Sequence, residues 1–478
     1  MIFQEYDIIV IGAGPSGVAA SVTSALNGAK VLIVDSSFDT GGQVYKPPPD
    51  TFQEIKKNYS TEIKIQKYHK KLLEEHGVHI ALEHTVWQVS KGFQIYAFNN
   101  RNKKISWKCK TLIVATGTYE RIIPFPGWTS PGVIGLAAST TLLKSHRVLP
   151  GYNTIVAGCG PLLAVVASGI IKAGGHVKAV IDLNGPFSWF SSISSMLTNP
   201  SSLIQGIGWL KDIIFSRTPI YFNSTVKEVI NHKNELEINI TKINSKGLIN
   251  TENIIKINAD SLCIGHGLIP SLDILTILGV KKFFDFQSAS WLAKTDKYFQ
   301  TSVNNLYIVG DGEGISGAVP AYEKGLLAGH SASLNLNFIS HKYFQRITKT
   351  IFVKLKKFEK FGKSMAKLMT PPSGLIQNIT DDTIICRCED IKRGEIEKAI
   401  KSGATEINQL KAWTRCGMGP CQGRTCEDTI ARIMADHVGD RQTVGMFARK
   451  IPIKPIPMDC AVGDFKYEDI KKVEEAPL

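Results

Sequence analysis

Five of the nine cysteines lie close together near the C-terminal end, and their spacing is typical of a metal site. Cys386 and Cys388 form a C-x-C pair, whereas Cys416, Cys421 and Cys426 form two overlapping C-x4-C pairs. Thiolates in two close pairs can converge on one metal centre, and such clustering favours metal binding in a reducing compartment over a disulfide framework. Zinc accepts four thiolates too, but C-x-C is uncommon in zinc sites, so we expect a 2Fe-2S cluster. Because that cluster takes four protein ligands, one of the five thiols is spare.

A glycine-rich turn near the N-terminus indicates a nucleotide site. The apolar run at residues 8–11 predicts a buried parallel strand, and a G-x-G-x-x-G turn and a helix of small residues follow it. These glycines permit a tight turn, a close approach of a pyrophosphate to the backbone and close packing of helix on strand. The next strand, at residues 31–34, ends on an acid that can accept a hydrogen bond from a ribose hydroxyl. We therefore predict adenine-dinucleotide binding by Gly12, Gly14, Pro15, Ser16, Gly17 and Asp35.

Further segments indicate that the dinucleotide is FAD. A strand followed by Gly-Asp-Gly and a small-residue helix, at residues 306–335, resembles the second FAD fingerprint, in which the helix N-terminus stabilises the negative charge of the reduced flavin. Two of the predicted FAD contacts have a structural alternative. Residues 41–43 can form a plain turn, and residue 86 can be a core position of a strand. No C-x-x-C or C-x4-C follows the first unit, so nothing there supports the chemistry of disulfide reductases. The further predicted FAD contacts are Gly41, Gly42, Gln43, Val86, Ala115, Thr116, Gly117, Gly310 and Asp311.

A second strand, glycine turn and helix begins near residue 153. Gly158, Gly160 and Asp182 repeat the pattern of the first unit, but Leu163 replaces the third glycine. Helix and strand cannot then approach as closely, and the carboxylate disfavours the 2′-phosphate of NADP. NAD, another adenine nucleotide and an empty site all remain possible here. Cys263 and His266 follow, and we interpret them as core and loop residues rather than a catalytic pair.

The stretch ATGTYERIIPFPGWTSPGV and the G-x-G-P-L-L form of the second turn resemble the flavoprotein subunits of opine oxidase, hydrogen cyanide synthase and hydroxyproline dehydrogenase. The segment GMGPCQGRTC resembles the 2Fe-2S domain of bacterioferritin-associated ferredoxin, which the opine oxidase family also carries. This second resemblance implies that Cys386, Cys388, Cys421 and Cys426 are the ligands and that Cys416 is the extra thiol. The first implies a hetero-oligomer with an amine-oxidising flavoprotein subunit, from which this chain passes electrons to a downstream acceptor.

Composition narrows the setting of the protein. The chain of 478 residues is 43% hydrophobic, enough for several cores, and no uncharged apolar stretch is long enough to span a membrane. We expect a cytoplasmic protein without nucleic acid as a partner, although the net charge of +14 does not by itself select a partner. Residues 342–367 carry nine Lys and Arg against one acid at the spacing of an amphipathic helix, for which we favour a linker over a peripheral membrane contact. Residues 185–216 are rich in Ser, Trp, Phe and Leu but have little basic flank.

We therefore expect an α/β fold with two interleaved Rossmann-like domains and a small α-rich 2Fe-2S domain. The predicted parts are a split FAD-binding domain (1–120 and 267–335), a second nucleotide-binding domain (121–266), an amphipathic linker helix (336–375), the 2Fe-2S domain (376–445) and a tail (446–478).

FAD takes up electrons in pairs and a 2Fe-2S cluster passes them singly, which indicates an oxidoreductase that converts between the two. The resemblance makes its substrates CH-NH donors of opine, glycine or hydroxyproline type. A stand-alone NAD(P)H-dependent flavin reductase and a ferredoxin-like docking module are the alternatives. We interpret Lys46, Tyr119, Glu120 and Arg121 as structural and assign no catalytic residue.

Overall fold

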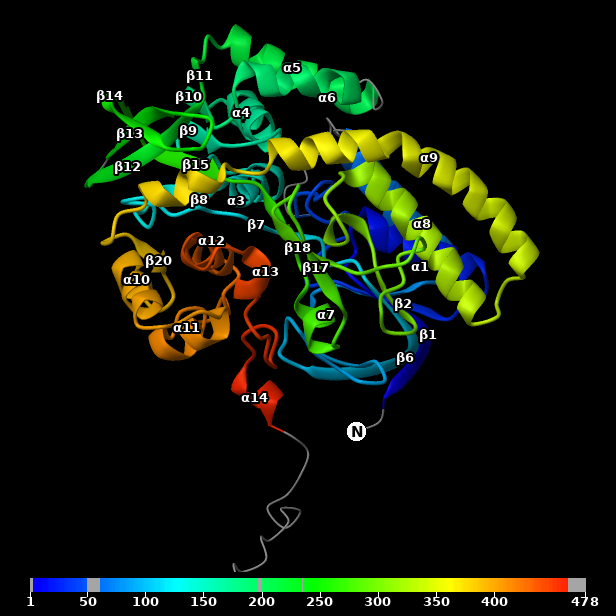
Figure 1. Ribbon diagram of the computed structural model, residues 1–478. Coiled ribbons are helices and arrows are strands. Elements are labelled where there is room, and N and C mark those ends of the chain that lie inside the picture. The colour runs from blue at the N-terminus through cyan, green and yellow to red at the C-terminus, as the bar shows by residue number, and fades with distance from the viewer. Residues whose placement is uncertain (1–2, 50–60, 197–199, 234, 463–478) are drawn as a thin grey trace, which may run out of the picture.

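The computed structural model describes residues 3–49, 61–196, 200–233 and 235–462 (Figure 1). The first sheet has the order β3-β2-β1-β6-β5-β4, with β19 also paired to β6. Strands β3, β2, β1, β6 and β19 run parallel, whereas β6, β5 and β4 form an antiparallel extension. The strands are β1 (Gln4–Ile11), β2 (Val31–Val34), β3 (His79–Ala81), β4 (His84–Ser90), β5 (Gln94–Asn99), β6 (Lys104–Val114) and β19 (Leu306–Ile308).

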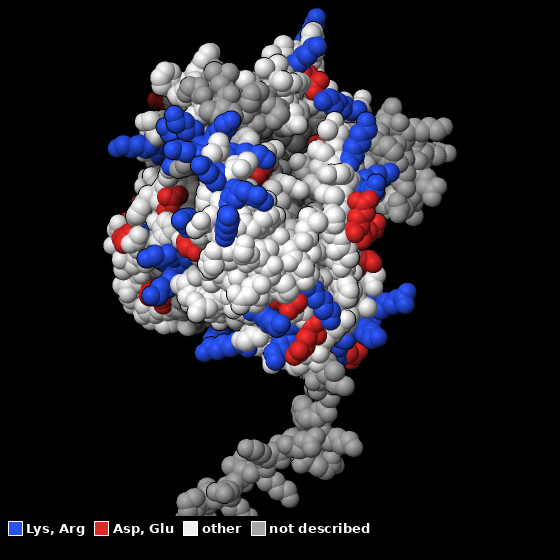
Figure 2. Space-filling view, turned by 90° about the vertical axis from the view of Figure 1, so that its right-hand side faces the viewer, with Lys and Arg blue, Asp and Glu red and all other residues white. Residues whose placement is uncertain are grey.

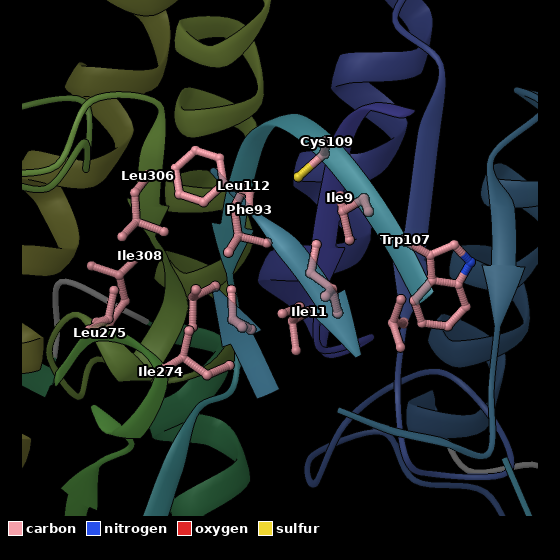
Figure 3. Close-up of a cluster of buried hydrophobic side chains, with 14 of the residues drawn as sticks. Ile9, Ile11, Phe93, Trp107, Cys109, Leu112, Ile274, Leu275, Leu306 and Ile308 are labelled. Atoms are coloured by element: carbon pink, nitrogen blue, oxygen red, sulfur yellow. The ribbon is translucent and has the colours of Figure 1, made fainter. Parts of the chain in front are cut away.

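Successive side chains of β1 point to opposite faces of this sheet, and each face carries its own hydrophobic core. Ile8 and Val10 pack with the helices α1 (Pro15–Leu26) and α8 (Ala318–Asn335). Ile9 and Ile11 point to the other face, where Figure 3 shows them in one cluster with side chains of β6, β19 and α7 (Asp273–Ile277). Since a parallel strand is covered on both sides, its residues 8–11 are all apolar, as the sequence shows.

The second nucleotide-binding unit has a parallel sheet of order β11-β10-β9-β15-β8, beside the antiparallel sheet β12-β13-β14. Two short antiparallel strands, β7 (Thr118–Glu120) and β16 (Leu268–Pro270), carry the chain into this unit and back out of it. The expected pair of interleaved Rossmann-like domains is thereby confirmed. The elements are β8 (Val133–Gly135), β9 (Asn153–Gly158), α4 (Leu162–Lys172), β10 (His176–Asp182), β11 (Ile220–Phe222), β12 (Ser224–His232), β13 (Glu235–Ile243), β14 (Ile249–Ala259) and β15 (Ser261–Gly265).

Three helices lie along the upper edge of the molecule in Figure 1: α5 (Pro186–Met196), α6 (Pro200–Phe215) and the long α9 (His341–Leu368). Helix α9 begins at Ser340, whose hydroxyl accepts a hydrogen bond from Tyr343 N at 3.3 Å. It packs against α8 and α5, and its buried side chains include Phe344 and Ile351. No helix among the described residues is long and apolar enough to cross a membrane.

The cysteine-bearing segment forms a separate small core with its own helices. This core also includes side chains of the second unit, such as Ile123 and Leu183, so the small domain packs on that unit. The tail returns to the body, where Phe447 joins the small core and Ile453 N donates to Trp87 O at 2.8 Å. The elements are β20 (Ile384–Cys386), β21 (Ile391–Lys392), α10 (Arg393–Lys401), α11 (Ile407–Thr414), α12 (Glu427–Val438), α13 (Arg441–Val444) and α14 (Met458–Ala461).

The remaining elements connect these units. They are α2 (Thr61–Glu75), α3 (Leu136–Thr141) with a π-helical turn (Leu142–His146), β17 (Lys282–Asp285), β18 (Ser290–Ala293) and two 3-10 turns (Gly310–Gly312 and Ser373–Asn378).

Replacing Gly17 with Ala should destabilise the flavin-binding unit by about 3 kcal/mol, because its Cβ would lie 1.8 Å from Gly12 O. We expect a lower melting temperature and loss of bound flavin in the purified protein. Gly206→Ala is the matched control, since Gly206 lies within α6 and an added Cβ there meets nothing within 4 Å. That control should stabilise the helix by roughly 0.5–1 kcal/mol. Equal melting temperatures for the two variants would contradict this packing account.

Candidate cofactor sites

The first glycine turn presents backbone without side chains at the N-terminus of α1. An added Cβ at Gly14 would meet only Gly42 Cα, at 3.8 Å, whereas Gly12, with φ +112°, lies tight against Ala115 O. Gly41 N donates to Ala13 O at 2.8 Å, which holds the Gly41–Gly42 pair beside the turn. A diphosphate can therefore reach the amides at the start of α1, where the helix dipole favours negative charge.

Asp35 is oriented by two backbone amides at the end of β2. Its Oδ2 accepts from Ala13 N at 2.6 Å and its Oδ1 accepts from Ser37 N at 2.7 Å. Its carbonyl accepts from His84 N at 2.9 Å, so β4, which carries Val86, starts beside the expected ribose site. Val86 itself is half-buried and packs against the hydrophobic core, so its contact with adenine stays a prediction.

The segments at both ends of the split domain meet behind this turn. Val309 N donates to Val114 O at 3.0 Å, which aligns the Ala115-Thr116-Gly117 segment with Gly310. Asp311 Oδ1 accepts from Ser316 N at 2.8 Å and from Gly317 N at 3.0 Å, just before α8 begins. A Cβ at Gly310 would lie 2.5 Å from Ser16 Oγ. The structure thus brings both predicted fingerprints together, while Gln43 lies to one side, where its Oε1 accepts from Thr141 Oγ1 at 3.4 Å.

The second glycine turn is in contact with the C-terminal end of α9. Asn184 Nδ2 donates to Leu368 O at 3.0 Å, and a Cβ at Gly160 would lie 2.5 Å from Met369 Cγ. Gly158 is pressed against β15, where an added Cβ would lie 1.7 Å from Gly265 O. The surface to which a pyrophosphate would bind is therefore shared with this chain's own side chains.

The carboxylate of the second unit is also occupied by its own neighbours. Asp182 Oδ1 accepts from Asn184 N at 2.9 Å, and its Oδ2 accepts from Trp189 Nε1 at 2.8 Å. Burial raises the pKa of Asp182 to about 6, although these hydrogen bonds act to lower it. Leu163 lies in the first turn of α4 and is buried in the core. These contacts favour the empty-site alternative over NAD for the second turn.

Three of the cysteine sulfur atoms form one buried group. The Sγ atoms of Cys386, Cys416 and Cys426 all lie within 4.8 Å of one another. Cys386 ends β20 and Cys426 immediately precedes α12. Hydrogen bonds from Cys416 and Cys426 lower the pKa of Cys386 to about 2, and this donation raises the pKa of both donors. The three sulfur atoms are therefore close enough together to hold one metal centre.

Cys388 and Cys421 form a second, half-buried pair joined by a hydrogen bond. The loop around them is tight, since a Cβ at Gly419 would lie 2.3 Å from Cys388 Cβ. An all-thiol donor set suits an iron–sulfur cluster, and the predicted ligands Cys386, Cys388, Cys421 and Cys426 come from both groups. The sequence did not reveal that Cys416 contacts two of these ligands, so the assignment of the spare thiol stays a prediction.

A chain of hydrogen bonds connects the cysteine loop to the predicted FAD contacts at residues 115–117, which follow β6. Sequence reasoning missed this connection. Arg424, which lies between two cysteines, donates from Nη1 to Cys421 O at 3.3 Å and from Nε to Tyr119 OH at 3.0 Å. Ser271 Oγ donates to the same Tyr119 hydroxyl at 2.8 Å, and Ser271 N donates to Gly117 O at 2.9 Å. Arg424 is only 14% exposed, and its position in the C-x4-C loop was the only sequence signal for these contacts.

Two buried carboxylates anchor the small domain on the body. Asp428 pairs with Arg121 Nε at 3.0 Å, and Asp273 Oδ2 lies 3.1 Å from Arg424 Nη2. Burial acts to raise the pKa of Asp428, but the surrounding guanidinium groups lower it overall. Two further arginines contact Asp428, and one further arginine contacts Asp273. They are Arg432, Arg441 and Arg449.

Cys263 and His266 are both buried. Burial raises the pKa of Cys263 to about 12 and lowers that of His266 to about 3. His266 Nδ1 accepts from Ile123 N at 3.1 Å. This is the arrangement of structural residues, and His266 lies in the loop between β15 and β16, where it is buried.

Comparison with known proteins agrees with these sites. A family model described as pyridine nucleotide-disulphide oxidoreductase matches residues 6–325, and one for the BFD-like [2Fe-2S] binding domain matches residues 384–436. One of the subunits of opine oxidase from Rhizobium meliloti (strain 1021) is 28% identical over 95% of this chain and 97% of its own length. Hydrogen cyanide synthase subunit HcnB of Pseudomonas aeruginosa is 27% identical over 94% of this chain and 97% of its own length. These relatives are of the kind that the sequence resembles.

A solved structure shares the fold at low sequence identity. L-proline dehydrogenase from P. horikoshii is 18% identical, with a TM-score of 0.70 over 96% of this chain and 80% of its own. The two family models and the sites described above identify FAD and a 2Fe-2S cluster as the cofactors.

Replacing Cys386 with Ser should remove the cluster, because it deletes a predicted ligand that lies in the buried three-sulfur group. Cys416→Ser should keep about two irons per chain, because four other thiolates remain. Iron and acid-labile sulfide assays on the purified full chain measure both outcomes. Cys460→Ser, at a buried cysteine whose Sγ donates to Asn102 O, is the control and should keep its iron. Loss of iron from Cys416→Ser together with full iron in Cys421→Ser would contradict the predicted ligand set.

NADH should not reduce the flavin of this chain, because Met369 and Leu368 contact the second glycine turn and Asp182 is already hydrogen-bonded. Anaerobic addition of NADH should leave the flavin absorbance unchanged. Dithionite added afterwards to the same sample should bleach it, which shows that the flavin can be reduced. Rapid bleaching by NADH alone would instead support a stand-alone reductase.

Proposed function

Because the chain belongs to the pyridine nucleotide-disulphide oxidoreductase family and continues into a BFD-like [2Fe-2S] domain, we propose that it takes electrons from an amine-oxidising flavoprotein partner and passes them onward. It is an electron-transferring oxidoreductase subunit with FAD and a 2Fe-2S cluster. In the proposal, the electrons come from CH-NH donors derived from amino acids, of opine, glycine or hydroxyproline type. The names of its relatives support a role within such a complex.

The observation that carries the proposal is the bonded connection between the two cofactor sites. FAD supplies two-electron chemistry with CH-NH donors, and a 2Fe-2S cluster supplies one-electron transfer. Arg424 bonds to the cysteine loop on one side and to Tyr119 on the other. Tyr119 in turn belongs to β7, which comes directly after the predicted FAD contacts at residues 115–117. This contact holds the two sites in one fixed arrangement.

Two residues that follow the predicted flavin contacts at residues 115–117 are held by contacts within this chain, which agrees with substrate oxidation in a separate subunit. Glu120 Oε1 accepts from Ala137 N at 2.9 Å, and burial raises the pKa of Glu120 to about 7. Arg121 is buried and donates to Ala289 O at 2.8 Å in addition to its pairing with Asp428. The guanidinium of Arg121 has no acceptor and cannot take a proton from an amine, and one oxygen of Glu120 is already hydrogen-bonded within this chain.

The full chain, purified with its partner subunit from source cells, should accept electrons from glycine, hydroxyproline or an opine. Anaerobic addition of the right amine should bleach the flavin and produce the electron paramagnetic resonance (EPR) signal of a reduced 2Fe-2S cluster. The chain without the partner should not respond to the amine. Reduction of the isolated chain by the amine would contradict the requirement for a partner.

Arg424→Met should slow cluster reduction in this complex while both cofactors stay bound. If the lost bonds raise the barrier by about 1.4 kcal/mol, the rate falls about tenfold. Arg415→Met is the matched control, since Arg415 lies beside the cluster cysteines but is exposed and pairs with Glu389 at 3.0 Å. Equal rates for the two variants would show that the Arg424 contact does not serve electron transfer.

A further inference from the structure

Helices α5 and α6 expose an unusual amount of apolar side chain. Large hydrophobic residues normally lie exposed singly, whereas here seven of them follow one another on two consecutive helices. The exposed fraction reaches 83% for Phe187 and 67% for Ile214. We call these seven residues the apolar hairpin: Phe187, Phe190, Ile204, Ile207, Leu210, Ile214 and Phe215.

The outward face of α6 is apolar because of its helical spacing. Ile207, Leu210 and Ile214 recur at intervals of three and four residues and share one side of the helix. Ile213 is buried on the adjoining side, about a quarter of a turn away, where α6 packs on α4. The helix therefore uses one apolar side for its own domain and leaves a second apolar side in solvent.

The same region has few charges of its own. No Asp, Glu, Lys or Arg occurs from Leu183 to Leu210. The first acid that follows, Asp212, is already engaged with Lys172 at 2.9 Å and with Ser168. Nothing negative therefore borders the apolar hairpin on α6.

The structure supplies the basic flank that the local sequence lacks. Helix α9 packs against α5 and carries exposed lysines along its C-terminal half. Four of these lysines form no ion pair with a described acid: Lys356, Lys357, Lys360 and Lys367. On α6, Lys211 Nζ lies 5.4 Å from the ring centre of Phe215. Figure 2, which views the side that lies to the right in Figure 1, shows Lys and Arg side chains gathered on the upper part of the molecule.

We propose that the apolar hairpin docks on the surface of an anionic phospholipid bilayer. Its Phe and Ile side chains enter the boundary between headgroups and acyl chains, and the α9 lysines contact lipid phosphates. A rim in which cations far outnumber acids complements an anionic surface, whereas the rim of a protein interface usually carries both signs. The helices are too short to span a bilayer and lie along its surface.

The test is flotation of the purified full chain, with its cofactors bound, on vesicles of phosphatidylglycerol and phosphatidylcholine in equal amounts. The wild-type chain should float with these vesicles and not with pure phosphatidylcholine. Ile207→Ser with Ile214→Ser should weaken binding at least about tenfold, because the apolar insertion is reduced. Leu26→Ser is the matched control, since Leu26 is 62% exposed in the last turn of α1, and should bind as the wild type does.

A second variant tests the charge component. Lys356→Gln, Lys357→Gln and Lys360→Gln combined should weaken binding and reduce its dependence on salt, because fewer screened charges remain. Flavin and iron contents of all variants should equal those of the wild type, which excludes misfolding.

Three outcomes would overturn the proposal. The wild type fails to bind anionic vesicles, or the Ile207→Ser, Ile214→Ser variant binds as well as the Leu26→Ser control. In the third, the wild type assembles with itself or with the oxidising subunit, but the Ile207→Ser, Ile214→Ser variant does not. That result would make the hairpin a protein interface. Vesicle binding is measured without electron transfer, so its result is independent of the proposed function.

Discussion

The buried ion pairs between the small domain and the body are the constraint on which the rest of the structure depends. Asp428 and Asp273 are 9% and 3% exposed, and each is surrounded by guanidinium groups. Burial lowers the pKa of Arg121 to about 10, although the charge of Asp428 acts to raise it. Removing one partner of such a pair costs about 3–5 kcal/mol because the other charge stays buried and unpaired. The cysteine-bearing domain is therefore held in one position on the body.

That position has a chemical consequence, because it determines what lies between the two cofactor sites. Arg424 is placed by Asp273 and by the Tyr119 hydroxyl at the same time, so the cysteine loop is bonded to the strand that follows the flavin segment. The end of α9 lies against the second glycine turn, at a place that nicotinamide-dependent members of such a fold need for their nucleotide. The two cofactor sites are thus joined by direct contacts, as an electron-transferring subunit requires.

The parts that the sequence predicted are those in which neighbouring residues determine the geometry. The turn from Gly12 to Gly17, the carboxylate of Asp35 and the Gly310-Asp311 segment follow from short spacings between strand and helix. The cysteine pairs were visible for the same reason. By contrast, Met369 reaches Gly160 from a distant part of the chain, and Arg424 meets Tyr119 only through tertiary packing. The apolar residues of α6 and the basic residues of α9 were both visible, but their proximity was not, because the two helices are more than one hundred residues apart.

The most direct test of the account is whether the cluster in the purified full chain is reduced through its flavin. Flavin, iron and sulfide assays should give about one FAD and two irons per chain. Under anaerobic illumination with a deazaflavin, the flavin absorbance should fall while the EPR signal of the reduced cluster grows in step with it. A flavin that bleaches completely while the cluster stays oxidised would contradict the claim that this chain passes electrons between the two.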